Sequence, residues 1–272
     1  MMNEKEYKTA VQTAFDEASE GYDLPALRFF DKSARRLIDD LALKGHENVL
    51  DIATGTGKVA LEASARLKSG KVTGIDMSEG MLAQARQKAL TLGLKNVSFH
   101  HLDVDKAVFP EKYFDGITCG FGVHFWSNME KPLLRMIRFL KPDAFVAVTS
   151  FSEGSFEPQT QMTLKRFESY GVKLPDSYTW KRLGSSEKCI SLFENIGLKN
   201  IRSYKAPMGY PLKSPDEWWD LLRYSGFRAY LNKLSPEQAK HYKAENLKEV
   251  WGTGEENAVP LKVDVIFTVA YT

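Results

Sequence analysis

One stretch, from Val49 to Ala60, limits most strongly what this chain can fold into. It joins a short apolar run to a glycine-rich turn and then to a segment with apolar residues at helical spacing. A strand buried on both faces and followed by such a helix is a unit of a parallel α/β sheet. Gly55 and Gly57 let the backbone turn sharply close to a ligand, and the first helical turn presents free N–H groups. The stretch therefore predicts a ligand site at the carboxyl end of a strand.

Two kinds of cofactor bind at such a turn. Gly55, Gly57 and Ala60 fit the dinucleotide pattern G-x-G-x-x-G/A, and Asp76 follows at the end of a second expected strand. Asp51, just before the turn, favours a different cofactor, because a carboxylate there repels a pyrophosphate and suits a cation. S-adenosylmethionine is such a ligand, since it carries a sulfonium and an ammonium group.

The motif Ala53-Thr54-Gly55-Thr56-Gly57 resembles the first motif of class I S-adenosylmethionine-dependent methyltransferases, within them the ubiquinone/menaquinone C-methyltransferase-like group. The resemblance covers roughly residues 45 to 152. It implies a Rossmann-like, doubly wound α/β sheet of seven strands with helical lid insertions. It also implies in-line methyl transfer to a small, planar or apolar organic acceptor, on carbon or oxygen, with S-adenosylhomocysteine as product. The alternatives are an NAD(P)-dependent oxidoreductase on a Rossmann sheet and a non-catalytic S-adenosylmethionine-binding scaffold.

The order of expected elements predicts one methyltransferase domain over residues 1–272. Its core comprises 45–152, 185–207 and 260–272, and its lid or cap segments are 1–30, 153–184 and 208–258.

Three parts of the second half need separate predictions. Residues 152–184 carry scattered aromatic rings without a clear period, which predicts an irregular cap. Capping boxes at Ser214 and Ser235 predict two helices, roughly 215 to 228 and 236 to 250. Alternation from Val263 to Ala270 predicts a last strand, which in the family lies antiparallel beside the fifth.

Asp51, Asp76 and Asp103 are expected at the ends of three successive strands. Asp76 would accept hydrogen bonds from the ribose hydroxyls, or it is only a charge at the start of the next helix. The resemblance implies that Asp103 accepts from the adenine amine and that Val104 covers a ring face. The residues expected at the cofactor are Asp51, Ala53, Thr54, Gly55, Thr56, Gly57, Asp76, Met77, Asp103, Val104, Gly120 and Phe121.

The loop after the fourth expected strand bears on the acceptor. DNA and protein-glutamine amino-methyltransferases carry an Asn/Asp-Pro-Pro-aromatic motif there, whereas this chain has Cys119-Gly120-Phe121-Gly122, which argues against a nucleobase amine. Phe121-Gly122 matches the quinone-type group. That group usually continues with Arg-Asn where this chain has His124-Phe125, so the resemblance does not carry a quinone-precursor substrate over to it.

Two residues are candidates for proton transfer. His124 is ionisable near neutral pH, so it is either a general base or a hydrogen-bonded part of the pocket wall. The phenol of Tyr22 is protonated at pH 7 unless its pKa is shifted, and its ring is interpreted as core packing, with a lid over the cofactor as the alternative. The residues expected around the acceptor are Tyr22, His124, Trp126, Phe151 and Tyr210.

Composition excludes several other classes. A net charge of +2 argues against a nucleic-acid partner, and 43% hydrophobic residues in 272 suffice for a large core. The apolar runs are too short to span a bilayer and the N-terminus lacks the order of a secretion signal, so a cytoplasmic location is expected. Cys119, Cys189, His100 and His101 lack metal-ligand spacing, so no metal is expected. The sequence does not determine whether the chain forms a homo-oligomer.

Overall fold

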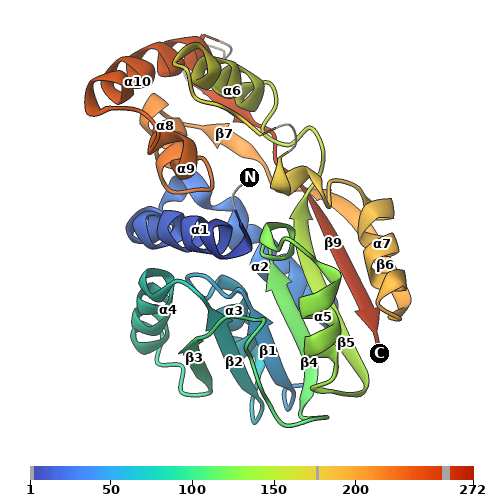
Figure 1. Cartoon of the computed structure of the whole chain (residues 1–272). Helices are drawn as coiled ribbons and strands as arrows, with labels where there is room; N and C mark the ends of the chain where they lie inside the picture. Colours follow the sequence, from blue (N-terminus) through green and yellow to red (C-terminus); the bar gives the residue numbers. More distant parts are fainter. Residues whose placement is uncertain (1–2, 176–177, 253–257) are drawn as a thin grey trace.

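The computed structural model describes residues 3–175, 178–252 and 258–272 (Figure 1). Its central sheet has seven strands in the order β3-β2-β1-β4-β5-β9-β6. Strand β9 pairs antiparallel with both of its neighbours, and the other pairs are parallel. The doubly wound sheet and its antiparallel last strand beside the fifth are confirmed. In chain order the strands are β1 (Asn48–Ile52), β2 (Lys71–Asp76), β3 (Val97–His101), β4 (Phe114–Gly120), β5 (Leu140–Phe151), β6 (Lys199–Pro207) and β9 (Asp264–Tyr271).

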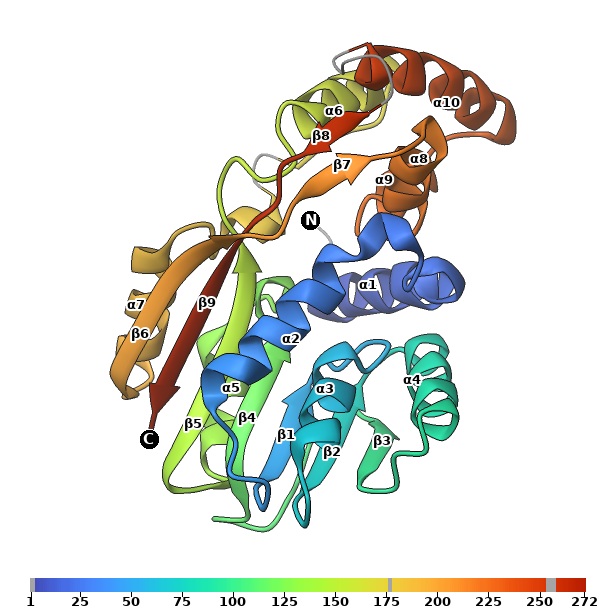
Figure 2. The ribbon, with the colours of Figure 1, turned by 180° about the vertical axis from the view of Figure 1, so that it is seen from behind.

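Helices cover the sheet on both faces, and each face has its own buried apolar cluster. One face carries α2 (Phe29–Leu41), α3 (Lys58–Arg66) and α4 (Glu79–Thr91), and the other carries α5 (Glu130–Ile137) and α7 (Ser186–Asn195) (Figures 1 and 2). Val49, Leu50 and Ile52 of β1 are fully buried, as a strand covered on both faces requires. This layering leaves the carboxyl ends of the parallel strands as the open edge for a ligand.

A helical cap stands above that edge (Figures 1 and 2). It contains α6 (Gln159–Ser169), α8 (Pro215–Arg223), α9 (Arg228–Leu231), α10 (Pro236–Trp251) and a two-stranded sheet of β7 (Tyr210–Leu212) and β8 (Val259–Leu261). At its centre the Trp218 indole donates to the Asn246 side-chain oxygen at 3.0 Å, and the Asn246 amide donates to the Thr163 hydroxyl at 3.1 Å. These bonds satisfy polar groups that the cap helices bury.

Two predictions about the cap were wrong in detail. Residues 152–184 are not irregular throughout, because they contain α6. Its buried face includes Gln159, Thr160 and Thr163, so the helical period is carried partly by polar residues and is not visible as an apolar stripe. The helix expected over 215–228 ends at Arg223, and α9 begins separately at Arg228.

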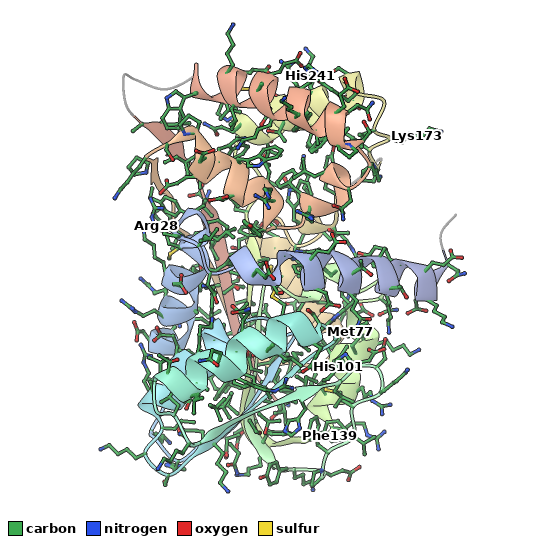
Figure 3. The ribbon with its side chains drawn as sticks, turned by 90° about the vertical axis from the view of Figure 1, so that its left-hand side faces the viewer. Arg28, Met77, His101, Phe139, Lys173 and His241 are labelled. Atoms are coloured by element: carbon green, nitrogen blue, oxygen red, sulfur yellow. The ribbon has the colours of Figure 1, made fainter. Side chains whose placement is uncertain are left out.

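Helix α1 (Glu4–Ala18) lies between the cap and the sheet, as the side view shows with Met77 and His101 beneath it (Figure 3). Asp16 fixes it to α4, because its carboxylate accepts from the Ser78 hydroxyl at 2.6 Å and from the Gly80 N–H at 3.0 Å. Glu17 ties it to the cap through Arg228 and Asn232, at 3.2 and 2.6 Å. None of the helices within the described ranges is long and apolar enough to cross a membrane.

Candidate active site

The glycine-rich turn after β1 has the backbone that its residues predict. Gly55 and Gly57 have positive φ angles of 54° and 81°, and space is open where a Cβ of Gly55 would stand. Gly57 faces inward instead, because its Cβ would lie 3.0 Å from that of Ala85. Gly57 therefore lets α3 begin close to α4, and the expected contact of its backbone with the cofactor stays a prediction.

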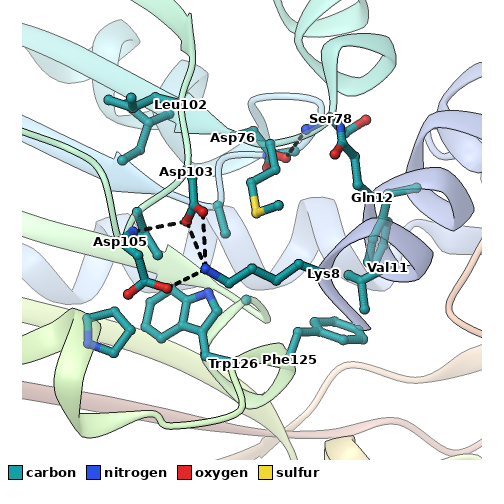
Figure 4. Close-up of a pocket in the computed structure, with 18 of the residues that line it drawn as sticks. Lys8, Val11, Gln12, Asp76, Ser78, Leu102, Asp103, Asp105, Phe125 and Trp126 are labelled. Atoms are coloured by element: carbon teal, nitrogen blue, oxygen red, sulfur yellow. Dashed lines mark hydrogen bonds and ion pairs between the residues drawn. The ribbon is translucent and has the colours of Figure 1, made fainter. Parts of the chain in front are cut away.

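A cavity, here called the main cavity, opens at this turn beneath α1 (Figure 4). Its floor comes from the carboxyl ends of β1, β2 and β4 and from the chain after β3, and its roof is one face of α1. The expected cofactor residues that line it are Ala53, Gly55, Asp76, Met77, Asp103, Val104, Gly120 and Phe121. The topology thus brings together side chains that are far apart in the sequence.

A second, smaller cavity adjoins the first, and we call it the inner cavity. The two share Tyr22, Ala53, Gly55, Gly120 and Phe121 as lining residues. Three further expected residues, Asp51, Thr54 and Thr56, line the inner cavity only. Tyr22 therefore lies at the junction of the two spaces, where its ring stacks on Phe30 with centroids 5.0 Å apart.

Asp51 is the acidic group of the inner cavity. Its side chain is 1% exposed, and its two oxygens accept from the hydroxyls of Thr54 at 2.5 Å and Thr118 at 2.7 Å. Burial raises the pKa of Asp51 to about 6, although both hydroxyl bonds act in the opposite direction. The Thr149 hydroxyl lines the same cavity and is buried without a partner among the described residues. A buried carboxylate and an unsatisfied hydroxyl suit a ligand with a cationic, hydrogen-bonding end.

Asp76 is fixed at the end of β2 by backbone donors. Its carboxylate accepts from the N–H groups of Gly55 at 2.7 Å and Ser78 at 2.9 Å, and burial raises its pKa. Each carboxylate oxygen has a further lone pair, so the group can still accept from a ligand.

Asp103 has a partner that the sequence did not suggest. Lys8 of α1 reaches across the main cavity and pairs with Asp103 at 3.1 Å and with Asp105 (Figure 4). Lys8 precedes Val11 and Phe15 on the same helical face, and all three line the cavity. The apolar residues Val11 and Phe15 at helical spacing were the available signal in the sequence, and Lys8 lies one turn before Val11 on the same face.

The loop after β4 forms another wall. Gly122 is required there, because a Cβ would stand 2.6 Å from that of Ala53. Phe121 has a positive φ of 58°, and its ring stacks on Phe151 with centroids 4.5 Å apart. Trp126 lines the main cavity as expected, and Phe125, which was not among the residues expected around the acceptor, lines it too.

His124 lies behind this wall and lines neither cavity. It is 2% exposed, and Nδ1 has no hydrogen-bond partner among the described residues. Burial, with a smaller effect from the charge of Arg182, lowers the pKa of His124 to about 3. A ring with so low a pKa is a weak proton acceptor, which argues against the general-base alternative for His124.

Two other residues expected at the acceptor are engaged elsewhere. The Tyr210 hydroxyl donates to the Ala26 carbonyl at 2.7 Å, and Arg28 lies 3.5 Å above its ring. Phe151 packs against Phe29 and Phe121. Neither residue lines the two cavities, so nothing in the geometry favours their contact with the acceptor, which stays a prediction. The ring of Tyr210 packs between the cap and α2, and the ring of Phe151 packs between the end of β5 and α2.

Sheet order and the position of the cavities define a class I methyltransferase fold. A methyltransferase domain model matches residues 49–143. Aklanonic acid methyltransferase DauC of Streptomyces sp. strain C5 is 35% identical over 57% of this chain and 72% of its own length. The ubiquinone/menaquinone biosynthesis C-methyltransferase UbiE of Cronobacter sakazakii is 28% identical over 64% of this chain and 75% of its own. The YcgJ protein of Bacillus subtilis has the same fold, with a TM-score of 0.59 at 20% identity over 89% of this chain and 98% of its own.

The chain belongs to the class I S-adenosylmethionine-dependent methyltransferases, in the group that includes UbiE. It is an enzyme, and S-adenosylmethionine is its methyl donor. The comparisons give no support to the oxidoreductase or to the non-catalytic scaffold.

Proposed function

We propose that this methyltransferase acts on a small, planar phenolic or quinone-like acceptor and methylates carbon or oxygen. The carrying observation is the ring-lined main cavity, which adjoins the inner cavity and whose lining includes the rings of Phe15, Tyr22, Phe121, Phe125 and Trp126. Aromatic walls favour a flat, apolar ligand. DauC and UbiE, whose names specify aklanonic acid and quinone biosynthesis, support this acceptor class.

The two cavities fit the cofactor. Asp76 would hold the ribose, Asp103 the adenine amine, and Met77 and Val104 would cover the adenine faces. Asp51 and the unpartnered Thr149 hydroxyl would hold the methionine end in the inner cavity. When bound, S-adenosylmethionine supplies an electrophilic methyl group on a cationic sulfur.

The contribution of the chain is to position the acceptor and to exclude water. Holding the reactants in the right orientation can lower the activation barrier by about 7–11 kcal/mol. A closed cavity also excludes water, which strengthens the electrostatic interactions inside it. His124 is a weak base, and burial raises the pKa of Tyr22, so neither side chain is expected to remove the acceptor proton. We therefore expect an acceptor acidic enough to react as its own phenolate or enolate.

The lid is the third part of the proposal. Helix α1 and Tyr22 provide the roof of the main cavity, whereas no described residue of 153–184 or 208–258 lines either cavity. The cap segments 153–184 and 208–258 would hold α1 in place from its other side. The bond from Arg228 of the cap to Glu17 of α1 is such a contact. We place the enzyme in the cytoplasm, in line with the two buried, unpaired cysteines.

Product analysis tests the acceptor class. The protein is incubated with isotopically labelled methyl donor in three parallel reactions, which contain aklanonic acid, reduced demethylmenaquinone or a cell extract. Labelled products are identified by mass spectrometry. The label is expected on a phenolic or quinone-like molecule. Labelling confined to a primary amine, a protein or a nucleic acid would contradict the proposal.

A further inference from the structure

Arg182 lies outside both cavities, and the geometry points to it as a positioning residue that fixes the wall of the main cavity. It follows the turn η4 (Thr179–Lys181), between β5 and α7. Its Nη1 donates to the carbonyls of His124 at 3.2 Å and of Trp126, and its Nη2 donates to the Ser127 carbonyl at 3.0 Å. One side chain thus binds three carbonyls of the loop after β4.

The loop needs such a donor because its own helix is too short. In η3 (Val123–Phe125) the N–H groups of Phe125 and Trp126 bond back to Gly122 and Val123, both at 3.1 Å. The helix ends there, so the next carbonyls require partners from elsewhere. A guanidinium offers five donors in a planar fork, whereas a lysine ammonium is a compact point charge.

Arg182 is itself anchored to the sheet. The Ser150 hydroxyl in β5 donates to the Leu183 carbonyl at 2.8 Å, and the Glu153 N–H donates to the Gly184 carbonyl at 2.8 Å. The guanidinium therefore connects the end of β5 to the loop that follows the neighbouring strand β4. No carboxylate within the described ranges forms an ion pair with Arg182, so its bonds are directed to the loop backbone.

The consequence concerns the loop side chains. Phe125, Trp126, Ser127 and Asn128 line the main cavity, and the Phe125 ring meets Phe15 of α1 edge-on with centroids 5.2 Å apart. With the carbonyls held on one side, these side chains keep their places on the cavity side. Arg182 would thereby set the shape of the main cavity and the contact between its wall and its roof.

Binding of S-adenosylhomocysteine tests this without reference to the acceptor. Affinity is measured by calorimetry for the wild type, Arg182→Ala and Arg182→Lys. Arg138→Ala is the control, because that arginine is exposed and its ion pair is with Glu111 on the surface. Hydrogen exchange of residues 122–128 is followed in parallel, and Arg182→Ala is also titrated in millimolar guanidinium chloride.

We expect Arg182→Ala to bind S-adenosylhomocysteine about tenfold or more weakly, with faster exchange confined to the loop, since charge-assisted hydrogen bonds are lost. Guanidinium ion should restore part of the affinity. Arg182→Lys should remain at least about threefold weaker, because it lacks the fork. Affinity within twofold of the wild type for Arg182→Ala, or unchanged loop exchange, would overturn the inference. If Arg182→Ala does not fold, wild-type binding by Arg182→Lys would overturn it equally.

Discussion

The buried carboxylate of Asp51 makes cofactor binding sensitive to pH. Its pKa is raised to about 6 by burial, and a bound cation favours the charged form and lowers that pKa. Binding of S-adenosylmethionine should then release a proton, so affinity should rise about tenfold between pH 5 and pH 7 and level off above. Asp51→Asn should flatten this dependence, which calorimetry across the pH range would detect. An unchanged slope in Asp51→Asn would assign the effect to another group, such as Asp76.

Replacing His124 is expected to change the pH dependence of stability, and not catalysis. Its pKa is lowered to about 3 by burial, so the unfolded chain binds more protons between pH 6.5 and 3. Stability attributable to the neutral ring is present above pH 6.5 and is lost as the pH falls toward 3. His124→Gln should weaken the dependence of the urea midpoint on pH between 7 and 4.

Catalysis by the same variant separates the two roles. We expect kcat of His124→Gln within about threefold of the wild type, with the acidic limb of the pH–rate profile intact, because proximity dominates the rate. Loss of that limb together with a fall of about 10²-fold or more would restore His124 as the base.

For single residues, the sequence predicted the position of a site residue in the fold better than the burial of its side chain. The glycines after β1 and the acids at or near the carboxyl ends of β1, β2 and β3 could be located from their spacing, because parallel strands end at one edge of the sheet. The burial of His124 behind Gly122 and Phe125 depends on how a single loop turns. No periodic pattern carries that information.

Among the elements, α1 is held against the floor of the main cavity by the partly buried ion pairs of Lys8 with Asp103 and Asp105. The side chains of Lys8 and Asp103 are 27% and 16% exposed, and Asp16 fixes the other end of the helix. Lys8→Ala should cost up to about 1 kcal/mol of local stability and speed amide exchange of residues 4–12 up to about fivefold. Lys5→Ala, an exposed change on the same helix, is the control. Equal exchange in the two variants would show that Lys8 does not hold the roof.

Helix α6 shows why the cap was harder to predict than the sheet. Strands such as β1 are buried on both faces, so apolar residues such as Val49, Leu50 and Ile52 stand close together and the pattern is visible in the sequence. In α6 the buried residues include Thr160 and Thr163, and Thr163 is selected by its bond to Asn246 in α10. Because part of the buried face of α6 is matched to residues some eighty positions away, the sequence of α6 itself shows no clear apolar period.

For the whole molecule, the expected single domain has a measurable consequence. Asn246 is fully buried and bonds both Trp218 and Thr163, so Asn246→Ala leaves two polar groups unsatisfied and should cost roughly 1–3 kcal/mol. If the cap and the sheet unfold together, urea transitions followed by tryptophan fluorescence and by circular dichroism should shift equally. Asn195→Ala, at a surface bond to Glu130, is the control. Fluorescence that changes at lower urea than circular dichroism would indicate a separately folding cap.

Strand β9 also determines when the fold can be completed during synthesis. It follows every other strand in the chain, yet it lies between β5 and β6 and pairs with both. Until residues 264–271 leave the ribosome, β5 has an unpaired edge of apolar residues, and β6 has no strand to pair with. Exposed apolar edges are sites of aggregation. A nascent chain stalled before Asp264 would therefore depend on a chaperone, even with its entire cofactor-binding half already translated.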